Sequence, residues 1–335
     1  MLRSVRRILE IERPDVVHTH NVTGFSPAIW KEVKRHGVPL VHTLHDHQLS
    51  CFRTALYRRG RACTSRCFDC RVVARSKKPL SAAVDAVIGV SHSVLDHHDH
   101  LGFFPRARRR RVIPNASPVP PCAERRRASD ALRVGYLGQL HPGKGIELLL
   151  CATEGLTQGR WEVKVGGRGA EDYVRTLRER FECPSVRFLG FVRPDDFFRE
   201  VDVLVVPSIW TEAAPMVIRE AYARGVPVVG SNRGGVPELV EEGETGVVFD
   251  PDRPETLRRA LERLMGDRSL LARMGERAVA RAAEAVPAVV ARRHVDLYGQ
   301  LRPMLSADPT PAVMDPPKES RRPAHDALTT PRSSA

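Results

Sequence analysis

The sequence predicts an α/β protein with two doubly wound domains. Short apolar runs rich in β-branched residues alternate with helix-like segments over residues 132–250, which is the pattern of repeated βαβ units and of a parallel sheet. The same alternation, with fewer strands, occupies residues 1–116, and a Pro-rich, charged linker is expected at 117–131. The length of 335 residues agrees with two domains.

The C-terminal domain is expected over residues 132–285. Its six candidate strands are 132–138, 161–167, 186–191, 201–206, 226–230 and 246–249. Helices are expected at 145–154, 170–181, 215–224 and 253–266. Six strands joined by crossovers long enough for helices predict one domain of nucleotide-binding shape.

The N-terminal domain is expected over residues 1–116. Candidate strands are 15–19, 39–44, 85–90 and 110–114, and candidate helices are 2–12, 25–36 and 91–101. The opening strands of a doubly wound domain, with the Gly-rich turn that usually binds phosphate, are absent, so an incomplete first domain is expected. A misplaced start codon and a genuine truncation are the two explanations.

The pattern changes near the end of the chain. Residues 269–302 are helical in pattern but interrupted by Pro287, which predicts a separate C-terminal helix at 286–302. Residues 303–335 consist largely of Pro, Ser, Thr and charged residues, with little apolar surface to bury. A disordered tail is therefore expected there.

The positive charge of the chain is concentrated in one segment, which indicates the kinds of partner that it could bind. The chain carries a net charge of +13, and residues 51–130 hold 17 Lys and Arg against 6 Asp and Glu. An anionic membrane surface, a phosphorylated acceptor, nucleic acid and a merely solvated surface are the interpretations of this basic segment. Aromatic residues make up only 6% and form no stacking platform, which argues against nucleic acid.

Hydropathy bears on the location of the protein. No apolar run reaches the length of a spanning helix, about 18 residues. The N-terminus lacks the apolar core of a signal peptide. The expected location is the cytoplasm, with the inner face of the membrane as a peripheral alternative.

Four cysteines lie within twenty residues, in an insertion at 51–70. They are Cys51, Cys63, Cys67 and Cys70, and the last three have C-x3-C-x2-C spacing. This spacing is compatible with a closed, structural zinc site, and free thiols in a flexible loop are the alternative. No motif places a base beside a thiol, so no nucleophilic cysteine is expected.

The densest chemical signal lies in residues 207–240. Glu212 is expected in the loop after a strand and Glu220 in the following helix, with seven residues between them. Loops at the carboxyl ends of parallel strands are where doubly wound domains bind ligands. A carboxylate accepts hydrogen bonds from two vicinal hydroxyls, which a ribose or a hexose offers.

Two glycine-containing turns predict an anion site beside these carboxylates. Gly234 and Gly235 precede a short helix, where amides without side chains in the way suit a diphosphate. Gly138 and Gln139 end the first strand of the domain, and Lys144 follows at the start of its helix. An ammonium is thus expected near the same phosphates.

These motifs resemble those of the GT-B glycosyltransferases of family 4, a retaining group that uses nucleotide-sugar donors. The E-x7-E pair, GQLHPGKG and GG-x-PE occur in the family's order. RPDVVHTHN, VPLVHTLHD, AVIGVSHSV and RVIPNAS are similar to later landmarks of its N-terminal domain, so the resemblance covers residues 13–302. It implies a GT-B architecture and retaining sugar transfer to a hydroxyl of a glycan or lipid-linked acceptor.

The resemblance also implies roles for individual residues. Glu220 would bind the ribose, Lys144 would neutralise the diphosphate, and Glu212 would hold donor-sugar hydroxyls beside the amides of Ala213 and Ala214. His45 would approach the donor sugar from the N-terminal domain. No cofactor is required, because Lys and amides replace the metal ion of other glycosyltransferases.

His45 belongs to a histidine-rich stretch for which two other interpretations stand. The set is His18, His20, His42, His45 and His47. Local capping by strand-end histidines and a metal site are both open. However, His42 and His45 point to opposite faces of a strand, so the five cannot all converge.

The chain departs from the family pattern at three places. Gln139 stands where the family usually has Arg, Pro215 replaces an amide-bearing residue of the E-G-F-G loop, and the opening strands are missing. The alternative function is therefore a truncated pseudoenzyme that binds nucleotide sugar without efficient transfer. An epimerase or a phosphorylase would share the architecture.

Overall fold

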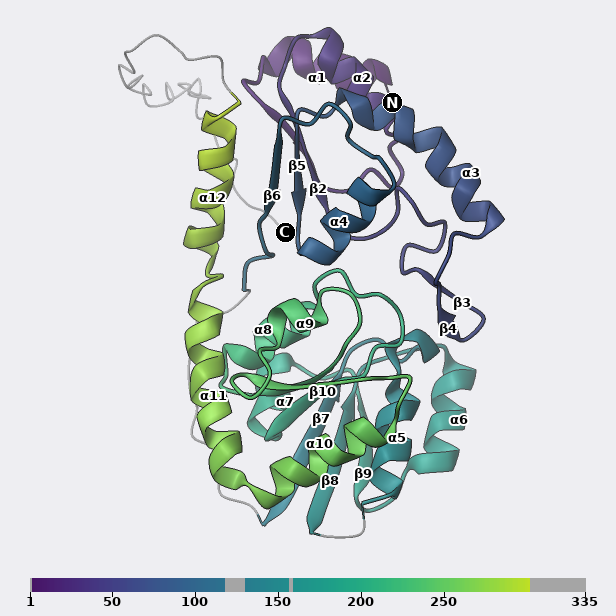
Figure 1. The fold of residues 1–335 in the computed structure, drawn as a ribbon, viewed down its shortest axis with the longest axis vertical. Helices are drawn as coiled ribbons and strands as arrows, with labels where there is room; N and C mark the ends of the chain where they lie inside the picture. The colour runs from purple at the N-terminus through teal and green to yellow at the C-terminus, as the bar shows by residue number, and fades with distance from the viewer. Residues whose placement is uncertain (1, 118–129, 157–158, 302–335) are drawn as a thin grey trace, which may run out of the picture. The chain divides into compact units, whose positions relative to one another are not determined.

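The computed structural model describes residues 2–117, 130–156 and 159–301 and contains two parallel sheets flanked by helices (Figure 1). The predicted α/β class is confirmed. Most of the predicted linker at 117–131 and the whole tail at 303–335 lie outside the described residues. In the part of the chain that is described, no helix has the length and apolar character needed to cross a bilayer.

The first sheet has four parallel strands in the order β1-β2-β5-β6. The strands are β1 (Val17–Thr19), β2 (Leu40–Leu44), β5 (Ala86–Gly89) and β6 (Arg109–Val112). The helices are α1 (Leu2–Glu12), α2 (Ala28–Arg35), α3 (Phe68–Lys77) and α4 (His92–His100), with a 3-10 turn η1 (Lys78–Ala83). Every residue of β2 and β5 is buried, including the polar His42 and Thr43 of β2, as expected for the central strands of a parallel sheet.

The predicted Cys-rich insertion is partly ordered into secondary structure. It contains a two-stranded antiparallel hairpin, β3 (Tyr57–Arg58) with β4 (Arg61–Ala62), and its end forms the start of α3. Neither element was expected from the sequence. Two-residue strands carry no usable periodicity, and α3 has only two fully buried side chains, Cys70 and Ala74.

The second sheet has six parallel strands in the order β12-β11-β10-β7-β8-β9. They are β7 (Ala131–Leu137), β8 (Arg160–Gly166), β9 (Val186–Gly190), β10 (Val203–Val206), β11 (Val228–Ser231) and β12 (Gly246–Phe249). All six had been expected within a few residues. Ala131 belongs to β7, where it pairs with Arg160, and not to the predicted linker.

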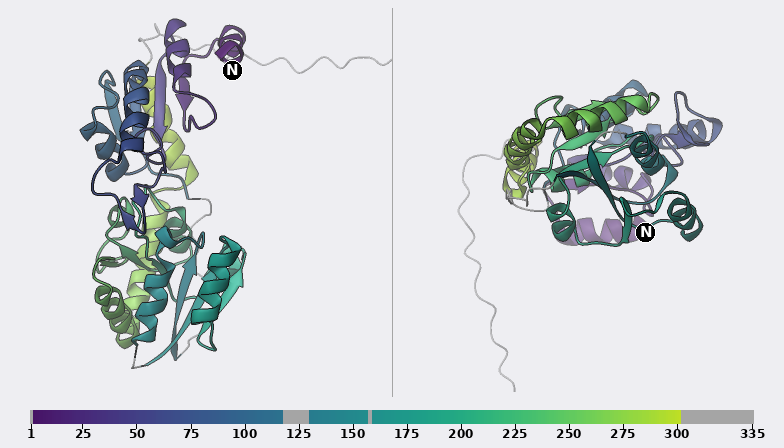
Figure 2. Two further views of the ribbon diagram at one scale, coloured as in Figure 1. Left: turned by 90° about the vertical axis from the view of Figure 1, so that its right-hand side faces the viewer. Right: turned by 90° about the horizontal axis from the view of Figure 1, so that it is seen from below.

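Helices cover both faces of this sheet (Figures 1 and 2). α5 (Ile146–Glu154), α6 (Glu171–Phe181) and α10 (Glu255–Gly266) pack in one apolar core. α7 (Pro194–Arg199), α8 (Met216–Tyr222) and α9 (Val236–Leu239) pack in a second core, and α11 (Arg268–Ala283) contributes to both. A 3-10 turn η2 (Pro142–Lys144) precedes α5. Strand order reverses between β7 and β10, which places the ligand crevice of such a fold at their carboxyl ends.

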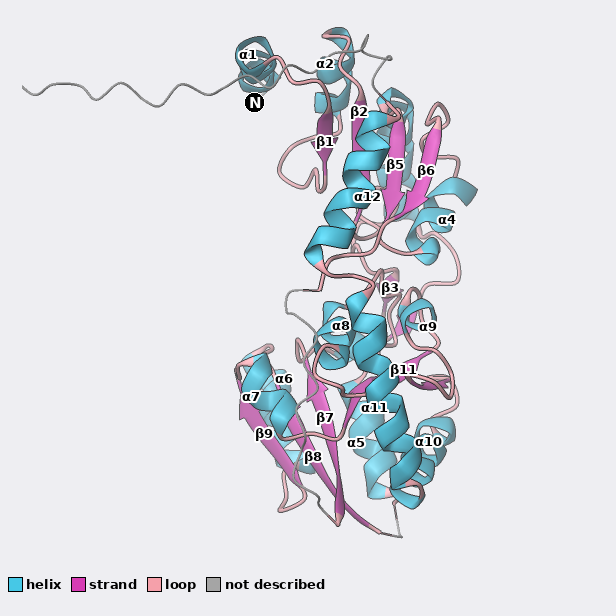
Figure 3. Ribbon diagram, turned by 90° about the vertical axis from the view of Figure 1, so that its left-hand side faces the viewer, coloured by secondary structure: helices cyan, strands magenta, loops and turns pink. Residues whose placement is uncertain are grey.

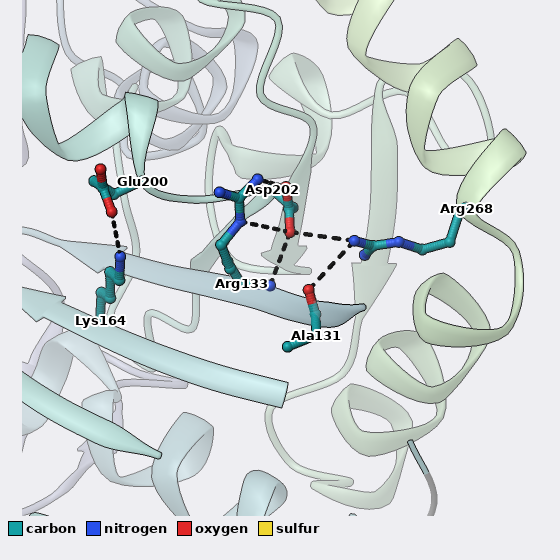
Figure 4. A network of polar contacts seen from close by, with 6 residues as sticks. All are labelled: Ala131, Arg133, Lys164, Glu200, Asp202 and Arg268. Atoms are coloured by element: carbon teal, nitrogen blue, oxygen red, sulfur yellow. Dashed lines mark hydrogen bonds and ion pairs between the residues drawn. The ribbon is translucent and has the colours of Figure 1, made fainter. Parts of the chain in front are cut away.

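A buried ion pair joins β7 to the start of β10 at the opposite end of the strands (Figure 4). Asp202 accepts hydrogen bonds from the Arg133 backbone N–H at 2.9 Å and from its guanidinium Nη2 at 2.7 Å. Arg268 of α11 lies 3.4 Å from the same carboxylate. Asp202 is only 7% exposed, so these cations balance a charge that would otherwise be costly to bury.

The C-terminal helix returns to the first sheet (Figure 3). The predicted break at Pro287 is present, and α12 runs from Pro287 to Gly299, shorter than the expected 286–302. Its Val290 and Leu297 share an apolar cluster with Val41 of β2 and with β5. The last of the described helices thus packs in the core of the first domain.

Candidate functional site

Two loops meet at the point where the strand order of the second sheet reverses. One follows β7 and contains residues 138–145, and the other follows β10 and contains residues 207–215. The backbone N–H groups of Ile209 and Trp210 both donate to the Gly143 carbonyl, at 2.9 and 3.0 Å. Gly145 has a positive φ of 71°, and a Cβ there would lie 1.9 Å from the Pro207 carbonyl oxygen. Glycine is therefore required for the two loops to approach this closely.

Glu212 is held by three donors at the centre of these loops. Its Oε1 accepts from Lys144 Nζ at 2.7 Å, from Ser208 Oγ at 2.7 Å and from Trp210 Nε1 at 2.6 Å. The residue is 8% exposed, and the Lys144 ammonium also lies 4.8 Å from the centre of the Trp210 ring. Among the described residues no donor contacts Oε2. One carboxylate oxygen is thus fixed and the other is open to a ligand.

A cavity of about 440 Å³ opens beside Glu212, within the usual range of small-molecule sites. It brings together five residues predicted for the site, which are His45, Gln139, Glu212, Ala213 and Ala214. His141, Trp210 and Arg53 of the insertion also line it. The backbone N–H of Thr211 donates to the Ala55 carbonyl at 3.2 Å, so the insertion contacts the Glu212 loop directly.

Gly138, Gln139 and Lys144 occupy the β7 side of the site. Gly138 lies directly after β7, and its N–H donates to the Gly166 carbonyl at 3.0 Å. The Gln139 carbonyl accepts from the Tyr136 hydroxyl at 2.7 Å, which fixes the backbone of this turn. Lys144 ends the 3-10 turn η2, with its ammonium on Glu212.

Gly234 and Gly235 have a different task from the one expected. The Gly235 N–H donates to the Glu212 carbonyl at 2.8 Å, so it is not a free amide for a phosphate. Gly234 has a φ of 60°, and a Cβ there would lie 2.0 Å from the same carbonyl oxygen. These glycines support the Glu212 loop from behind, because the loop packs directly on their backbone. The Gly235 amide is therefore in use within the chain, and the predicted anion site at Gly234 and Gly235 stays a prediction for the Gly234 amide alone.

Glu220 lies on α8 and does not line the cavity around Glu212. Among the described residues its carboxylate has no hydrogen-bond or ion-pair partner. Burial raises the pKa of this carboxyl above its ordinary value. A half-buried carboxylate without a partner is suited to accept hydroxyl donors from a ligand.

The histidines form two separate groups. His45 Nε2 lies 2.9 Å from His20 Nδ1, and His18 contacts Tyr298 at 2.6 Å and Thr43 at 2.7 Å. Burial lowers the pKa of His45 and, with the neighbouring histidines, lowers that of His18 to about 3. The rings in this group are therefore neutral near pH 7.

The other two predicted histidines lie elsewhere. His42 is buried in β2 with Thr19 at 2.9 Å, and the His47 ring stacks on His98 at 5.8 Å. The prediction that the five histidines do not converge is thus correct.

The structure gives no support to the zinc prediction for the cysteines and agrees with the alternative of free thiols. Cys67 Sγ and Cys70 Sγ lie 3.5 Å apart, but no three His, Cys, Asp or Glu side chains in residues 2–117, 130–156 and 159–301 converge as metal ligands. Burial raises the pKa of the Cys63 and Cys70 thiols, whereas hydrogen bonds with Cys70 lower the pKa of the Cys67 thiol. The cysteines are free thiols in the structure.

Sequence reasoning missed three side chains of the site. Ser208 and Trp210 hold Glu212, and His141 stacks on Trp210 with ring centres 5.3 Å apart. The sequence W-x-E contained a signal for Trp210. The bond of Ser208 depends on how the loop turns back, which the residue types alone do not reveal.

Two family models match the chain in succession. Residues 1–116 match the glycosyl transferase 4-like domain, and residues 123–281 match glycosyl transferases group 1. An uncharacterized 42.6 kDa protein in the cps region of Klebsiella pneumoniae is 29% identical over 227 residues, which cover 68% of this chain and 60% of that protein. The D-inositol 3-phosphate glycosyltransferase of Corynebacterium diphtheriae is 34% identical over 50% of this chain and 42% of its own length. The chain thus spans about half the length of the curated relatives it matches.

Solved structures agree in fold. The structure of Anabaena HepE in complex with UDP has a TM-score of 0.72 at 21% identity, covering 90% of this chain and 82% of HepE. Sucrose-phosphate synthase from Thermosynechococcus elongatus has a TM-score of 0.70 at 22% identity, covering 90% and 77%. By its two successive sequence domains and by its fold, the chain belongs to the GT-B glycosyltransferases.

Proposed function

We propose that the chain is a retaining glycosyltransferase of family 4, which moves a sugar from a nucleotide diphosphate sugar to a hydroxyl of a glycan or a lipid-linked acceptor. The observation that carries the proposal is the state of Glu212. This buried carboxylate stands at the ligand crevice with one oxygen fixed by three donors and the other without a partner. HepE, a structural neighbour, was solved with UDP and with UDP-glucose, which supports a nucleotide-sugar donor.

In this proposal the donor lies across the two loops and α8. Oε2 of Glu212 accepts from hydroxyls of the donor sugar, beside Ala213 and Ala214. The unpartnered Glu220 accepts from the ribose hydroxyls, since a carboxylate suits a vicinal diol. The ammonium of Lys144, which donates to Glu212 Oε1, is proposed to face the diphosphate next to the sugar-binding carboxylate.

The proposed reaction is a front-face displacement. The bond between the anomeric carbon and the diphosphate oxygen breaks, and the acceptor oxygen bonds to the anomeric carbon on the same face. The acceptor proton passes to the departing diphosphate oxygen. Lys144 offsets the negative charge that develops there, and no metal ion is needed for this task. The neutral His45 ring offers a hydrogen bond to the donor sugar from the first domain.

We also propose that the acceptor is met at an anionic membrane surface. Arg109 and Arg111 on the edge strand β6 are exposed, within the basic segment 51–130. Each exposed cation near such a surface contributes about 1 kcal/mol at low salt. Co-sedimentation with phosphatidylglycerol vesicles, and not with phosphatidylcholine vesicles, is the expected result. Loss of binding in a double Arg109→Gln, Arg111→Gln variant would assign it to this strand.

The experiment that tests the donor site is a calorimetric and thermal-shift screen of the full chain. UDP, GDP, ADP and their glucose conjugates are the probes. A ligand at 100 times its Kd should raise the free energy of unfolding by about 2.7 kcal/mol. No response to any probe, from a protein that melts cooperatively, would refute the donor site.

Stereochemistry and transfer need a separate readout. The enzyme should slowly hydrolyse the donor that it binds, and proton NMR can monitor the sugar that is released. The first sugar released should have the same anomeric configuration as the donor. The inverted anomer as first product would refute the retaining mechanism. Donor binding without hydrolysis or transfer to any hydroxyl would instead favour a binding protein.

A further inference from the structure

A second cavity, of about 550 Å³, lies next to α8 and shares no lining residue with the cavity around Glu212. Its walls come from α8, α11 and α12, together with Ser91 and His92 at the start of α4. α8 packs beside α11 (Figure 3). Three arginines from three different helices line it, namely Arg219, Arg281 and Arg293.

Arg219 is the unusual member of this group. The residue is only 9% exposed, and its Nε has no hydrogen-bond partner. Among the described residues no carboxylate pairs with its guanidinium. A guanidinium offers five N–H donors, and burying its charge without a partner is costly. A residue in this state is suited to a ligand that brings the missing negative charge.

The surroundings of Arg219 are themselves positive. Burial and the charges of Arg281 and Arg293 lower the pKa of Arg219, and Glu284 and Tyr222 only partly oppose them. The Tyr222 hydroxyl is already bonded to Thr245 at 2.8 Å. Three cations that line one cavity repel one another unless an anion lies between them.

The carboxylates of the cavity are already in use. Glu238 accepts from the backbone N–H groups of His92 and Ser93, at 2.6 and 2.7 Å. Glu284 is paired with Arg281. Neither carboxylate forms an ion pair with Arg219 or Arg293, so the cavity retains two cations without an ion-pair partner among the described residues.

We propose that this cavity binds the phosphate group of a small phosphate monoester, with Arg219 as the main contact and Arg293 as the second. A phosphate monoester carries close to two negative charges, which match the two remaining guanidinium groups. Guanidinium N–H groups also fit phosphate oxygens in pairs. A volume of 550 Å³ exceeds a phosphate group alone and leaves space for the molecule that bears it.

The test is calorimetric titration of the full chain with glycerol 3-phosphate and with inorganic phosphate, at low ionic strength in chloride buffer. One ligand should bind per chain, glycerol 3-phosphate at least as tightly as inorganic phosphate. Arg219→Gln should weaken both at least tenfold. Arg259→Gln, an exposed arginine on α10, is the matched control and should bind like the wild type. Binding of inorganic phosphate alone would overturn the assignment to a monoester.

Two further arms separate this cavity from the donor site. Saturation with UDP should leave phosphate binding unchanged, whereas displacement by UDP would place the phosphate at the donor site and overturn the proposal. Unaltered binding in Arg219→Gln, or no binding to the wild type, would also overturn it. Should Arg219→Gln fail to fold, the exposed Arg293→Gln should still weaken binding several-fold. Failure of UDP to bind would count against the proposed function and leave the phosphate result interpretable.

Discussion

Replacing Trp210 by Phe should remove one hydrogen bond to Glu212 and keep an aromatic ring at the same position. The indole N–H donates to Glu212 Oε1 at 2.6 Å, and the ring also lies over the Lys144 ammonium. Phe keeps an aromatic ring in this place and removes only the donor. A hydrogen bond to a charged group contributes about 1.5–3 kcal/mol. Because Lys144 and Ser208 still donate to the same oxygen, the net loss in the free energy of unfolding should be about 1–2 kcal/mol.

The same change should act selectively on the donor. Glu212 is proposed to contact the sugar and not the nucleotide, so UDP affinity should stay as in the wild type. The additional affinity for UDP-glucose over UDP should fall about tenfold, which corresponds to about 1.4 kcal/mol. Urea unfolding measures the first effect, and calorimetric titration with UDP and UDP-glucose measures the second.

Trp161→Phe is the matched control for Trp210→Phe. Trp161 packs partly buried against the core of the second domain, and no hydrogen bond of its indole N–H is present among the described residues. The Trp161→Phe variant should bind UDP and UDP-glucose with the affinities of the wild type. An equal loss of UDP and UDP-glucose affinity in Trp210→Phe would refute the assignment of Glu212 to the sugar. Unchanged stability would refute the importance of the indole bond.

Three further predictions concern carboxylates with distinct surroundings. Glu220→Gln should weaken nucleotide binding by about 1–3 kcal/mol at neutral pH. Because burial raises the pKa of Glu220, wild-type affinity should fall on acidification at a higher pH than for an exposed Glu, and a flat calorimetric pH profile would contradict this. For Asp202, burial opposes ionisation but the Arg133 hydrogen bonds outweigh it and lower the pKa. Its stabilising contribution is therefore present above the ordinary Asp pKa and lost as pH falls through the lowered value. Asp202→Asn should cost about 3 kcal/mol at pH 7 in urea unfolding, with a smaller difference from wild type in acid. Glu238→Gln replaces a charged cap on two amides of α4 by a neutral one and should lower Tm by about 2–4 °C, and an unchanged Tm in calorimetry would exclude a stabilising cap.

Strands such as β5, β10 and β12 were predictable because they are short, continuous apolar runs. β12, for instance, has the expected bounds 246–249. α7 could be given no bounds from the sequence because its six residues are too few to show a helical period. α3 was missed because the spacing of Cys67 and Cys70 was interpreted as that of metal ligands in a loop. The structure instead places them at the N-cap and third position of a helix.

The site was predictable in its residues and not in its contacts. Glu212 and Lys144 stand out by type and motif, but they are 68 positions apart, and their ion pair depends on the order of the strands that carry their loops. Gly235 was expected to offer its amide to a phosphate, and only the path of the Glu212 loop shows that the amide is used. Arg219 looks like any helical arginine in sequence, since burial is a property of the packed helices around it.

The packing of α12 on the first sheet has a consequence for producing the first domain as a separate fragment. The side chains of β2 and β5 that face α12 include Val41, Ala86 and Ile88, none of them exposed in the complete chain. A fragment ending after β6 would present this apolar strip to water and be prone to aggregation. The residues of this apolar cluster are thus encoded in two pieces separated by the whole second domain, and a fragment that keeps the strip covered must contain both pieces.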